Sequence, residues 1–381
     1  MPVDDIADAL PLVDHHCHGL FPADLDDARL ADSLSEAFAP APPGTSHWDK
    51  PVALSVRRWC APVLDLPPLC PPAEYAERRR ALGAAEVNRR FLAATGIGTY
   101  IVDSGNRPEE LCSVTEVGAI ASAPAREIVR MESVAEGVAR GGVSAAGYAQ
   151  AFEAAVRSAV GDENVVGLKS ILAYRATLRI DYGNPAPAEV EAAAGRWLAE
   201  IEQTGNVRLV DQTLERHLIW AGADIARERG FPIQFHIGMG DPDIELHRVD
   251  PSHLTPWVKE VESWGFPITL LHCYPFHREA GLMAENFPQV YCDVGFALNW
   301  VGPSYQRIMD EALELVPFTK QLFSTDAFGL AELYFLGAKR FRTALTRALG
   351  KWIDDDECSV TEAERIATLI GVENARRIYR L

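Results

Sequence analysis

The chain places three histidines within four residues close to its N-terminus, directly after the short apolar run 10–13. In a β-strand, side chains two positions apart point to the same face, so Asp14, His16 and His18 are expected side by side. Two neutral imidazoles at the end of a buried strand are half of a divalent-metal site. A solvated His-rich turn is the alternative. Cys17 alternates to the other face and is expected in the core rather than among the ligands.

Four later segments repeat this arrangement, with a short apolar run followed closely by a polar side chain. These side chains are Lys169, His236, His272 and Asp326. In a parallel α/β barrel, the catalytic groups lie where the strands end and their following loops begin. A single histidine at such a place is more often a core or capping residue, but several in one register with an acid are hard to explain by chance. The sequence therefore predicts that these side chains meet His16 and His18 around a metal.

Eight short apolar runs, each followed by a longer amphipathic stretch, indicate the architecture. The runs lie at residues 10–13, 99–102, 127–131, 165–168, 232–235, 267–271, 290–294 and 321–324. Strands that alternate with helices pair in parallel, and eight such units are the number in a TIM-type barrel. A doubly wound open sheet would use the same alternation, but no Gly-x-Gly-x-x-Gly motif opens a helix here. We therefore expect an α/β fold of the (β/α)8 barrel type, with helices at 147–160, 189–204 and 214–229.

The interval between the first and second expected strands is much longer than the others. Residues 21–95 contain several closely spaced prolines and one expected helix at 73–94. We interpret this segment as an insertion at the barrel mouth, a lid or an oligomer contact, within a single domain that spans the whole chain. A tolerated surface excursion is the alternative. After the last strand, helices are expected at 338–352 and 361–380, the second with Ser359 as its N-cap.

The composition excludes several classes of partner. The formal net charge is −18 and no block rich in Lys or Arg occurs, so nucleic acid would be repelled. Seven scattered cysteines without a Cys-x-x-Cys pair are typical of a reducing compartment, and the acidic start differs from the basic start of a signal peptide. No apolar run is long enough to span a bilayer. We therefore expect a cytoplasmic protein that acts on a small molecule and can form a homo-oligomer.

These motifs resemble the amidohydrolase superfamily over essentially the whole chain. Its pattern is His-x-His on the first strand, His on the fifth and sixth, and Asp on the eighth; here it matches His16-Cys17-His18, His236, His272 and Asp326. The sequence segments around these residues are most similar to the amidohydrolase 2 branch, and within it to the domain linked to glutamine-synthetase-like proteins. The segments that carry this similarity are 167–175, 236–241, 272–276, 323–326 and 373–379. The resemblance implies a metal-dependent hydrolase barrel and leaves the substrate open.

The chemistry of the residues suggests a role for each. His16, His18 and Asp326 suit one divalent ion, and His236 can complete its coordination. Zinc is the expected metal, although manganese, iron or cobalt would suit the same ligands. Such an ion lowers the pKa of a coordinated water to about 7, and Asp326 is expected to take its proton as general base. His272 is expected to polarise the substrate carbonyl or to shuttle the proton, with a purely structural role as the alternative.

Lys169 leaves three alternatives open. Some members of the superfamily carboxylate a lysine on the fourth strand, and the carbamate then bridges two ions, the second held by His236 and His272. The amidohydrolase 2 branch often carries a lysine there while it binds one ion, so one ion is the favoured prediction. In the third alternative Lys169 is a plain cation that binds substrate.

Four residues beyond the strand ends are candidate substrate contacts. Arg175 follows Lys169 in a loop over the expected mouth, where its guanidinium could grip a carboxylate through two parallel hydrogen bonds. A solvated or salt-bridged surface position is equally compatible with the sequence. Asp241 and His247 follow the fifth strand and Tyr274 follows the sixth, although charged loops are usually only solvated.

The sequence favours metal-dependent hydrolysis of a C–N (amide) bond in a small molecule that carries a carboxylate. The alternative is metal-dependent, non-oxidative decarboxylation of an aromatic or related acid, which relatives in the same branch perform. Lactone hydrolysis and a non-catalytic barrel module are less favoured, the latter because the ligand set is complete. The products separate the two leading reactions, because hydrolysis yields an amine and an acid whereas decarboxylation releases carbon dioxide.

Overall fold

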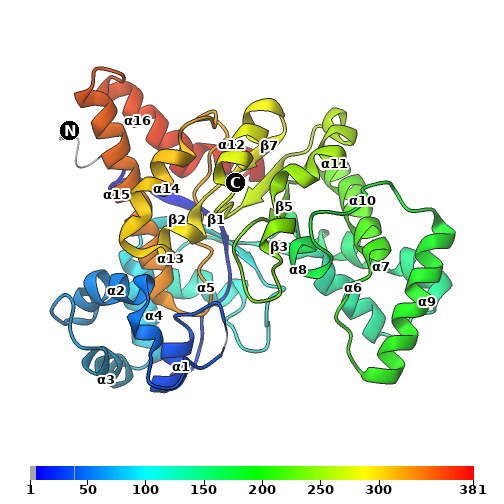
Figure 1. The fold of residues 1–381 in the computed structure, drawn as a ribbon, viewed down its shortest axis with the longest axis horizontal. Coiled ribbons are helices and arrows are strands. Elements are labelled where there is room, and N and C mark those ends of the chain that lie inside the picture. The colour runs from blue at the N-terminus through cyan, green and yellow to red at the C-terminus, as the bar shows by residue number, and fades with distance from the viewer. Residues whose placement is uncertain (1–5, 38) are drawn as a thin grey trace.

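The computed structural model describes residues 6–37 and 39–381. Within them, seven parallel strands form one curled sheet, and each strand is hydrogen-bonded to the next in sequence order (Figure 1). The strands are β1 (Leu12–Cys17), β2 (Ile97–Asp103), β3 (Ala125–Arg130), β4 (Val165–Ser170), β5 (Ile233–His236), β6 (Ile268–Leu271) and β7 (Val290–Cys292). Strands alternate with helices throughout, which confirms the predicted α/β barrel.

The predicted eighth strand at 321–324 is wrong as a regular strand. Gln321 forms an isolated bridge with Cys292 of β7, and the backbone of this segment then turns to β1. The Phe323 carbonyl accepts from His15 N at 3.1 Å, and Asp326 N donates to the His16 carbonyl at 3.0 Å. The segment therefore joins β7 to β1 and closes the barrel. Because it changes partner within a few residues, it forms no continuous ladder with either neighbour.

Helices cover the outside of the sheet, α6, α7, α9 and α10 on one side and α13, α14 and α15 on the other (Figure 1). Their bounds are α1 (Asp27–Asp32), α2 (Pro51–Ser55), α3 (Pro72–Leu82), α4 (Ala84–Ala94), α5 (Val114–Ala121), α6 (Met131–Arg140), α7 (Tyr148–Ala159), α8 (Leu172–Arg175), α9 (Pro187–Thr204), α10 (Gln212–Arg229), α11 (Thr255–Glu260), α12 (His277–Asn286), α13 (Gly295–Trp300), α14 (Tyr305–Ala312), α15 (Ala331–Asp354), α16 (Val360–Thr368) and α17 (Asn374–Tyr379). The helices predicted at 147–160, 189–204 and 214–229 are confirmed as α7, α9 and α10.

The segment 21–95 folds mainly as short helices, and α1 to α4 gather on one side of the barrel (Figure 1). The single helix predicted at 73–94 is wrong, because Gly83 adopts a φ of 78° and separates α3 from α4. Only glycine takes this backbone conformation without steric cost, so the helix ends there and a new one begins. Whether the segment acts as a lid or as an oligomer contact stays a prediction.

The C-terminal helices close one end of the barrel. The predicted helix at 361–380 is divided by a π-helical turn, Leu369–Glu373, into α16 and α17, and the Ser359 side chain caps α16 as predicted. Tyr379 of α17 reaches the barrel interior, where its hydroxyl lies 3.0 Å from His15 Nδ1. Cys17 is buried in the core, as expected. The candidate site lies at the opposite end of the barrel, at the carboxyl ends of the strands. No helix among the described residues is long and apolar enough to cross a bilayer.

Candidate metal centre

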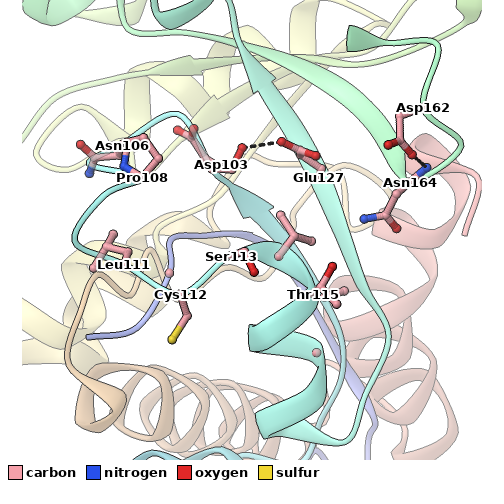
Figure 2. Close-up of a pocket in the computed structure, with 15 residues that line it drawn as sticks. Asp103, Asn106, Pro108, Leu111, Cys112, Ser113, Thr115, Glu127, Asp162 and Asn164 are labelled. Carbon is pink, nitrogen blue, oxygen red and sulfur yellow. Dashed lines mark hydrogen bonds between the residues drawn. The ribbon is translucent and has the colours of Figure 1, made fainter. Parts of the chain in front are cut away.

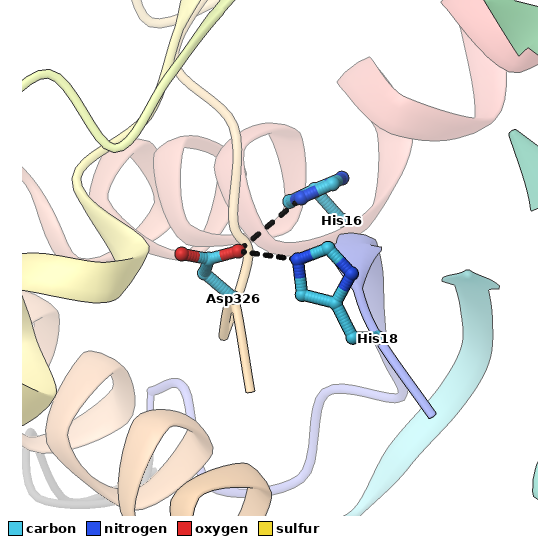
Figure 3. Close-up of side chains that lie close together, drawn as sticks. All are labelled: His16, His18 and Asp326. Atoms are coloured by element: carbon cyan, nitrogen blue, oxygen red, sulfur yellow. Dashed lines mark ion pairs between the residues drawn. The ribbon is translucent and has the colours of Figure 1, made fainter. Parts of the chain in front are cut away.

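Three side chains from the two ends of the chain converge where β1 meets the closing segment. Asp326 Oδ1 lies 3.2 Å from His16 Nε2 and 3.4 Å from His18 Nε2 (Figure 3). All three ligand atoms lie within 4.8 Å of one another. His16 lies on β1 and His18 just beyond it, two residues apart, so the alternation of the strand directs both imidazoles to the same face. The structure therefore brings together three of the four predicted metal ligands.

Hydrogen bonds to residues outside this group of three orient the ligand side chains. His18 Nδ1 lies 3.2 Å from the carbonyl oxygen of Asp103, which can only accept, so the proton sits on Nδ1 and Nε2 keeps its lone pair. Asp326 adopts a φ of 46°, a left-handed conformation that is costly for a residue with a side chain. Its neighbour Thr325 donates both its backbone N–H, at 2.8 Å, and its hydroxyl, at 2.6 Å, to the Asp14 carboxylate. Asp14 thus fixes the strained segment that presents Asp326.

Lys169 is buried beside this group. Its Nζ lies 2.9 Å from His16 Nε2 and 3.1 Å from Asp103 Oδ2. The same carboxylate oxygen accepts from two nitrogens of Arg130, at 2.6 and 3.0 Å. Burial opposes the charge of Asp103, but Arg130 and Lys169 outweigh it and hold the pKa of this carboxyl below its usual value. Burial also lowers the pKa of the Lys169 amine.

The other two predicted histidines lie next to one another on the far side of the cluster. His236 ends β5 and His272 follows β6, and their ring centroids are 4.9 Å apart. His272 Nε2 is 3.5 Å from Asp326 Oδ2. His236 is not part of the group whose ligand atoms lie within 4.8 Å of one another. Burial lowers the pKa of both imidazoles well below the usual value, so both are neutral.

The cluster opens into a cavity of about 430 Å³ at the carboxyl ends of the strands. Its lining has two parts. Side chains at or near the strand ends line one part, namely His18, Lys169, His236 and Asp326. Loop residues line the other, and these include Glu36, Arg175, Arg208 and Asp241. Tyr174 also lines the cavity, and its ring centroid lies 4.3 Å from that of His236. A volume of this size accommodates a small metabolite rather than a polymer segment.

The predicted substrate contacts divide into two pairs. Arg175 and Asp241 line the cavity. The structure does not bring His247 or Tyr274 to it: His247 lies exposed on a short 3₁₀ turn, and the Tyr274 ring stacks on His277 at 5.9 Å. In both cases the chain has turned away from the barrel axis after leaving its strand. Sequence distance from a strand end does not determine the direction of a loop.

Both cavity residues of this set already interact with the protein. Arg175 Nη2 lies 3.1 Å from Glu136 Oε1, and its Nε has no acceptor among the described residues. Arg175 therefore forms the salt bridge that the alternative prediction allowed, but it does so at the cavity wall, with its side chain only 10% exposed. Asp241 accepts a hydrogen bond from Asp243 N at 2.9 Å, and burial raises the pKa of its carboxyl.

Comparison with known proteins agrees with this arrangement of ligands. The profile of the amidohydrolase family (Amidohydro_2) matches residues 125–381, more than half of the chain. The chain belongs to this amidohydrolase family. It is 31% identical over 243 residues to Protein fluG of Emericella nidulans, in an alignment that covers 61% of this chain and 28% of that protein. The amidohydrolase described here therefore spans less than a third of the length of that relative.

Solved structures share the fold of this amidohydrolase over nearly its whole length. A candidate metal-dependent hydrolase from Lactobacillus casei superimposes with a TM-score of 0.86 at 26% identity and covers 99% of this chain and 97% of its own. Glucuronate isomerase from Caulobacter crescentus superimposes with a TM-score of 0.69 at 13% identity, over 99% and 93% of the two chains, which shows a shared fold alone. Family and fold together place this chain in the amidohydrolase superfamily.

A second cavity lies beside β2, β3 and α5 and is larger, about 580 Å³ (Figure 2). It shares Asn106 with the cavity above the histidines, but none of the histidines lines it. Its wall carries Glu127, whose carboxylate accepts from the Ser104 hydroxyl, and the N-terminal residues of α5 (Figure 2). Of these two cavities, size alone would favour this one. The smaller one contains the groups that can hold a metal and move protons, so we place the chemistry of this amidohydrolase there.

Sequence reasoning missed several residues of the site. Asp103 and Arg130 end β2 and β3, in the same register as His236 on β5, so the rule that singled out the histidines could have found them. Tyr174 follows β4 and had the same signal. Glu36 had none, because its place depends on the path of a long insertion rather than on any strand.

The residues present fit a divalent ion. Neutral imidazole nitrogens and a carboxylate oxygen are ligands that zinc and its neighbours accept. Asp326 Oδ1 and His236 Nε2 are buried without a hydrogen-bond partner among the described residues, and buried polar atoms are rarely left so unless something is to bind them. A cation among His16, His18 and Asp326 removes that cost. The donors specify the class of metal and not its identity.

Proposed function

We propose that this amidohydrolase cleaves the C–N bond of a small amide that carries a carboxylate, with one divalent ion and water. The observation that carries the proposal is the convergence of His16, His18 and Asp326, of which His18 and Asp326 line a cavity whose wall contains arginines. When bound, an ion of the zinc type supplies Lewis acidity that polarises a carbonyl and makes water nucleophilic at neutral pH. Proton transfer and substrate binding are assigned to side chains of the protein.

Asp326 is suited to move the proton. Its Oδ1 faces the two imidazoles assigned to the ion, whereas its Oδ2 points toward His272 Nε2 at 3.5 Å. One oxygen can therefore coordinate while the other accepts a proton from water and later returns it to the departing nitrogen. Neutral His272 is positioned to donate to the oxygen of the substrate carbonyl or to receive the proton from Asp326. Both roles are proposals that rest on these distances.

The carboxylate of the substrate is assigned to the arginine wall. A guanidinium has five N–H donors, and the Arg175 ion pair with Glu136 leaves its Nε without an acceptor. Arg130 also borders the cavity, although two of its nitrogens are committed to Asp103. A carboxylate between these side chains would satisfy donors that the protein leaves free.

One ion is favoured because the described residues contain a single group of three mutually close ligand atoms. Lys169 Nζ lies 2.9 Å from His16 Nε2, close enough to the assigned ion to repel it when charged, and burial lowers the pKa of this amine. Zinc is the proposed metal. A carboxylated Lys169 would add a second ion, held by His236 and His272.

The test uses the purified chain, metal content by elemental analysis, and a panel of small amides that carry a carboxylate. We expect about one equivalent of metal and release of an amine together with an acid. Chelation should abolish turnover and zinc should restore it, with unfolding temperature as the check that the fold persists. Turnover that survives complete removal of metal, or release of carbon dioxide in place of an amine, would overturn the proposal.

A further inference from the structure

Two carboxylates at the mouth of the cavity form no ion pair within the described chain. Glu36 comes from the loop after α1 and Asp241 from the loop after β5, and both line the cavity. In the part of the chain that the structure describes, no hydrogen bond reaches Glu36, and no cationic nitrogen lies within 4.0 Å of either carboxylate. Burial, together with repulsion by Asp326 and Asp241, raises the pKa of Glu36 to about 8, and the attraction of Lys50 and Arg107 offsets this only in part. A cation in direct contact with the carboxylate would lower the pKa further.

The cationic side chains of the same cavity are in the opposite situation. Arg130 and Lys169 share Asp103, Arg175 pairs with Glu136 at 3.1 Å, and Arg208 pairs with Asp243 at 2.7 Å. Arg107, which also lines the cavity, lies 4.0 Å from Glu110. Each of these cationic groups thus has an acidic partner in the protein. Outside the metal cluster, Glu36 and Asp241 are the carboxylates of this cavity without an ion pair among the described residues.

Two buried nitrogen atoms of the cavity residues also lack a hydrogen-bond partner among the described residues. The Nε2 atom of His236, a residue only 5% exposed, lines the same space without a hydrogen-bond partner in the described chain. Arg175 Nε is likewise buried and without an acceptor. The ion expected at His16, His18 and Asp326 adds positive charge at the floor, but the group of close ligand atoms includes neither Glu36 nor Asp241. The floor ion therefore leaves these two carboxylates without direct coordination.

From this arrangement we infer that the substrate carries an ammonium group, held between Glu36 and Asp241, in addition to the carboxylate directed to Arg175. The substrate class is then an amino-acid amide, with its reacting carbonyl over the histidines and its two charges at the mouth. This inference rests on the proposed function and narrows it. An ammonium has three N–H donors, which two carboxylates can share, and each such hydrogen bond is charge-assisted at both ends.

Matched pairs of amides test the inference directly. L-Glutamine and glutaramate differ only in the α-ammonium, as do L-asparagine and succinamate. With the metal-loaded chain, kcat/KM for the ammonium member is expected to exceed that of its partner by roughly tenfold to a hundredfold, the worth of one hydrogen bond between charged groups. In the Glu36→Gln and Asp241→Asn variants this ratio should fall toward one. In Glu202→Gln, a change on the outer helix α9, the ratio should stay as in the wild type.

Calorimetric titration of the same four compounds separates this inference from the proposed function. If no amide is hydrolysed but the ammonium members bind better and lose that advantage in Glu36→Gln, the hydrolytic proposal fails and the ammonium site stands. If amides are hydrolysed without any preference for the ammonium, or if no difference in binding exists, the ammonium site is wrong. The unfolding temperature of each variant shows that a lost preference does not come from a lost fold.

Discussion

Two buried groups of ionisable side chains lie on opposite faces of β4. The strand-end cluster consists of His16, His18, Lys169, His236, His272 and Asp326. The helix-layer cluster consists of Glu132, Glu136, Arg175 and Glu215. Adjacent residues of β4 connect to them: Lys169 Nζ reaches His16, whereas the Ser170 hydroxyl donates to Glu132 Oε1 at 2.7 Å. The alternation of one strand therefore separates two polar environments.

The two clusters handle burial in different ways. Burial lowers the pKa of His16, His236 and His272, which leaves these imidazoles neutral, with lone pairs that can bind a cation. In the helix-layer cluster, burial raises the pKa of both Glu215 and Glu132, and repulsion by Glu132 adds to the effect at Glu215. Neither oxygen of Glu215 has a hydrogen-bond partner among the described residues. Nitrogen lone pairs favour a metal, whereas crowded buried acids favour protonation.

The largest expected effect comes from removal of a ligand in the strand-end cluster. His16→Ala should lose bound metal and activity together, because the ion supplies several kcal/mol of transition-state stabilisation, roughly a thousandfold or more in rate. Elemental analysis and turnover of one preparation measure both. Glu132→Gln, an equally buried change in the helix-layer cluster, is the control and should retain the metal. Stoichiometric metal in His16→Ala would remove this histidine from the ligand set.

Asp326→Asn should separate binding from proton transfer. Asn keeps an oxygen that can coordinate but cannot accept a proton, so much of the metal should remain while turnover falls by about 10² to 10⁴. The measurement is kcat at saturating metal, with metal content determined in parallel. Rates close to the wild type would show that another group, such as His272, moves the proton.

The strand-end cluster could be predicted from the sequence because it obeys a register rule. His16, His236 and Asp326 follow apolar runs at the same point, and parallel strands bring their carboxyl ends to one edge whatever the details of packing. Asp103 obeyed the same rule but was overlooked, since an acid that ends a strand is common. What decides its role is the pair of cations that it holds, and these come from other strands.

Features that depend on tertiary paths could not be predicted. The closing segment 321–324 is apolar like a strand, but it must bond to β7 and β1 in turn, and this excludes a regular ladder. Glu36 reaches the cavity only because of the course of the insertion. His247 and Tyr274 were expected there because of their sequence neighbourhood, and their loops lead elsewhere. The helix-layer cluster could not be predicted, since Glu132 and Glu136 lie on α6 whereas Glu215 lies on α10 and Arg175 on α8.

Lys169→Met tests whether the strand-end cluster holds one ion or two. With one ion, the substitution should leave the metal content unchanged, and turnover should fall because a positive group beside His16 is lost. With a bridging carbamate, the metal content should fall to half. Metal analysis before and after incubation with bicarbonate distinguishes the two, because only a carbamate depends on dissolved carbon dioxide. The folded state of the variant is checked by its unfolding temperature, since Lys169 is buried.

The smallest effect is expected from Glu215→Gln, and it concerns stability. Burial raises the pKa of Glu215 well above its ordinary value of 4.5. The folded chain keeps a proton that the unfolded chain releases above that pH. Raising the pH therefore lowers the free energy of unfolding, by about 1.4 kcal/mol per pH unit for one group. The Gln variant has no such contribution.

Urea denaturation between pH 5 and pH 7 should therefore show the wild type losing stability relative to Glu215→Gln, while Glu202→Gln on the exposed side of α9 keeps the wild-type slope. Equal slopes for the wild type and Glu215→Gln would mean that Arg175 holds Glu215 ionised. In that case both clusters would contain ionised carboxylates. The two faces of β4 would then differ only in that one cluster contains imidazoles and the other does not.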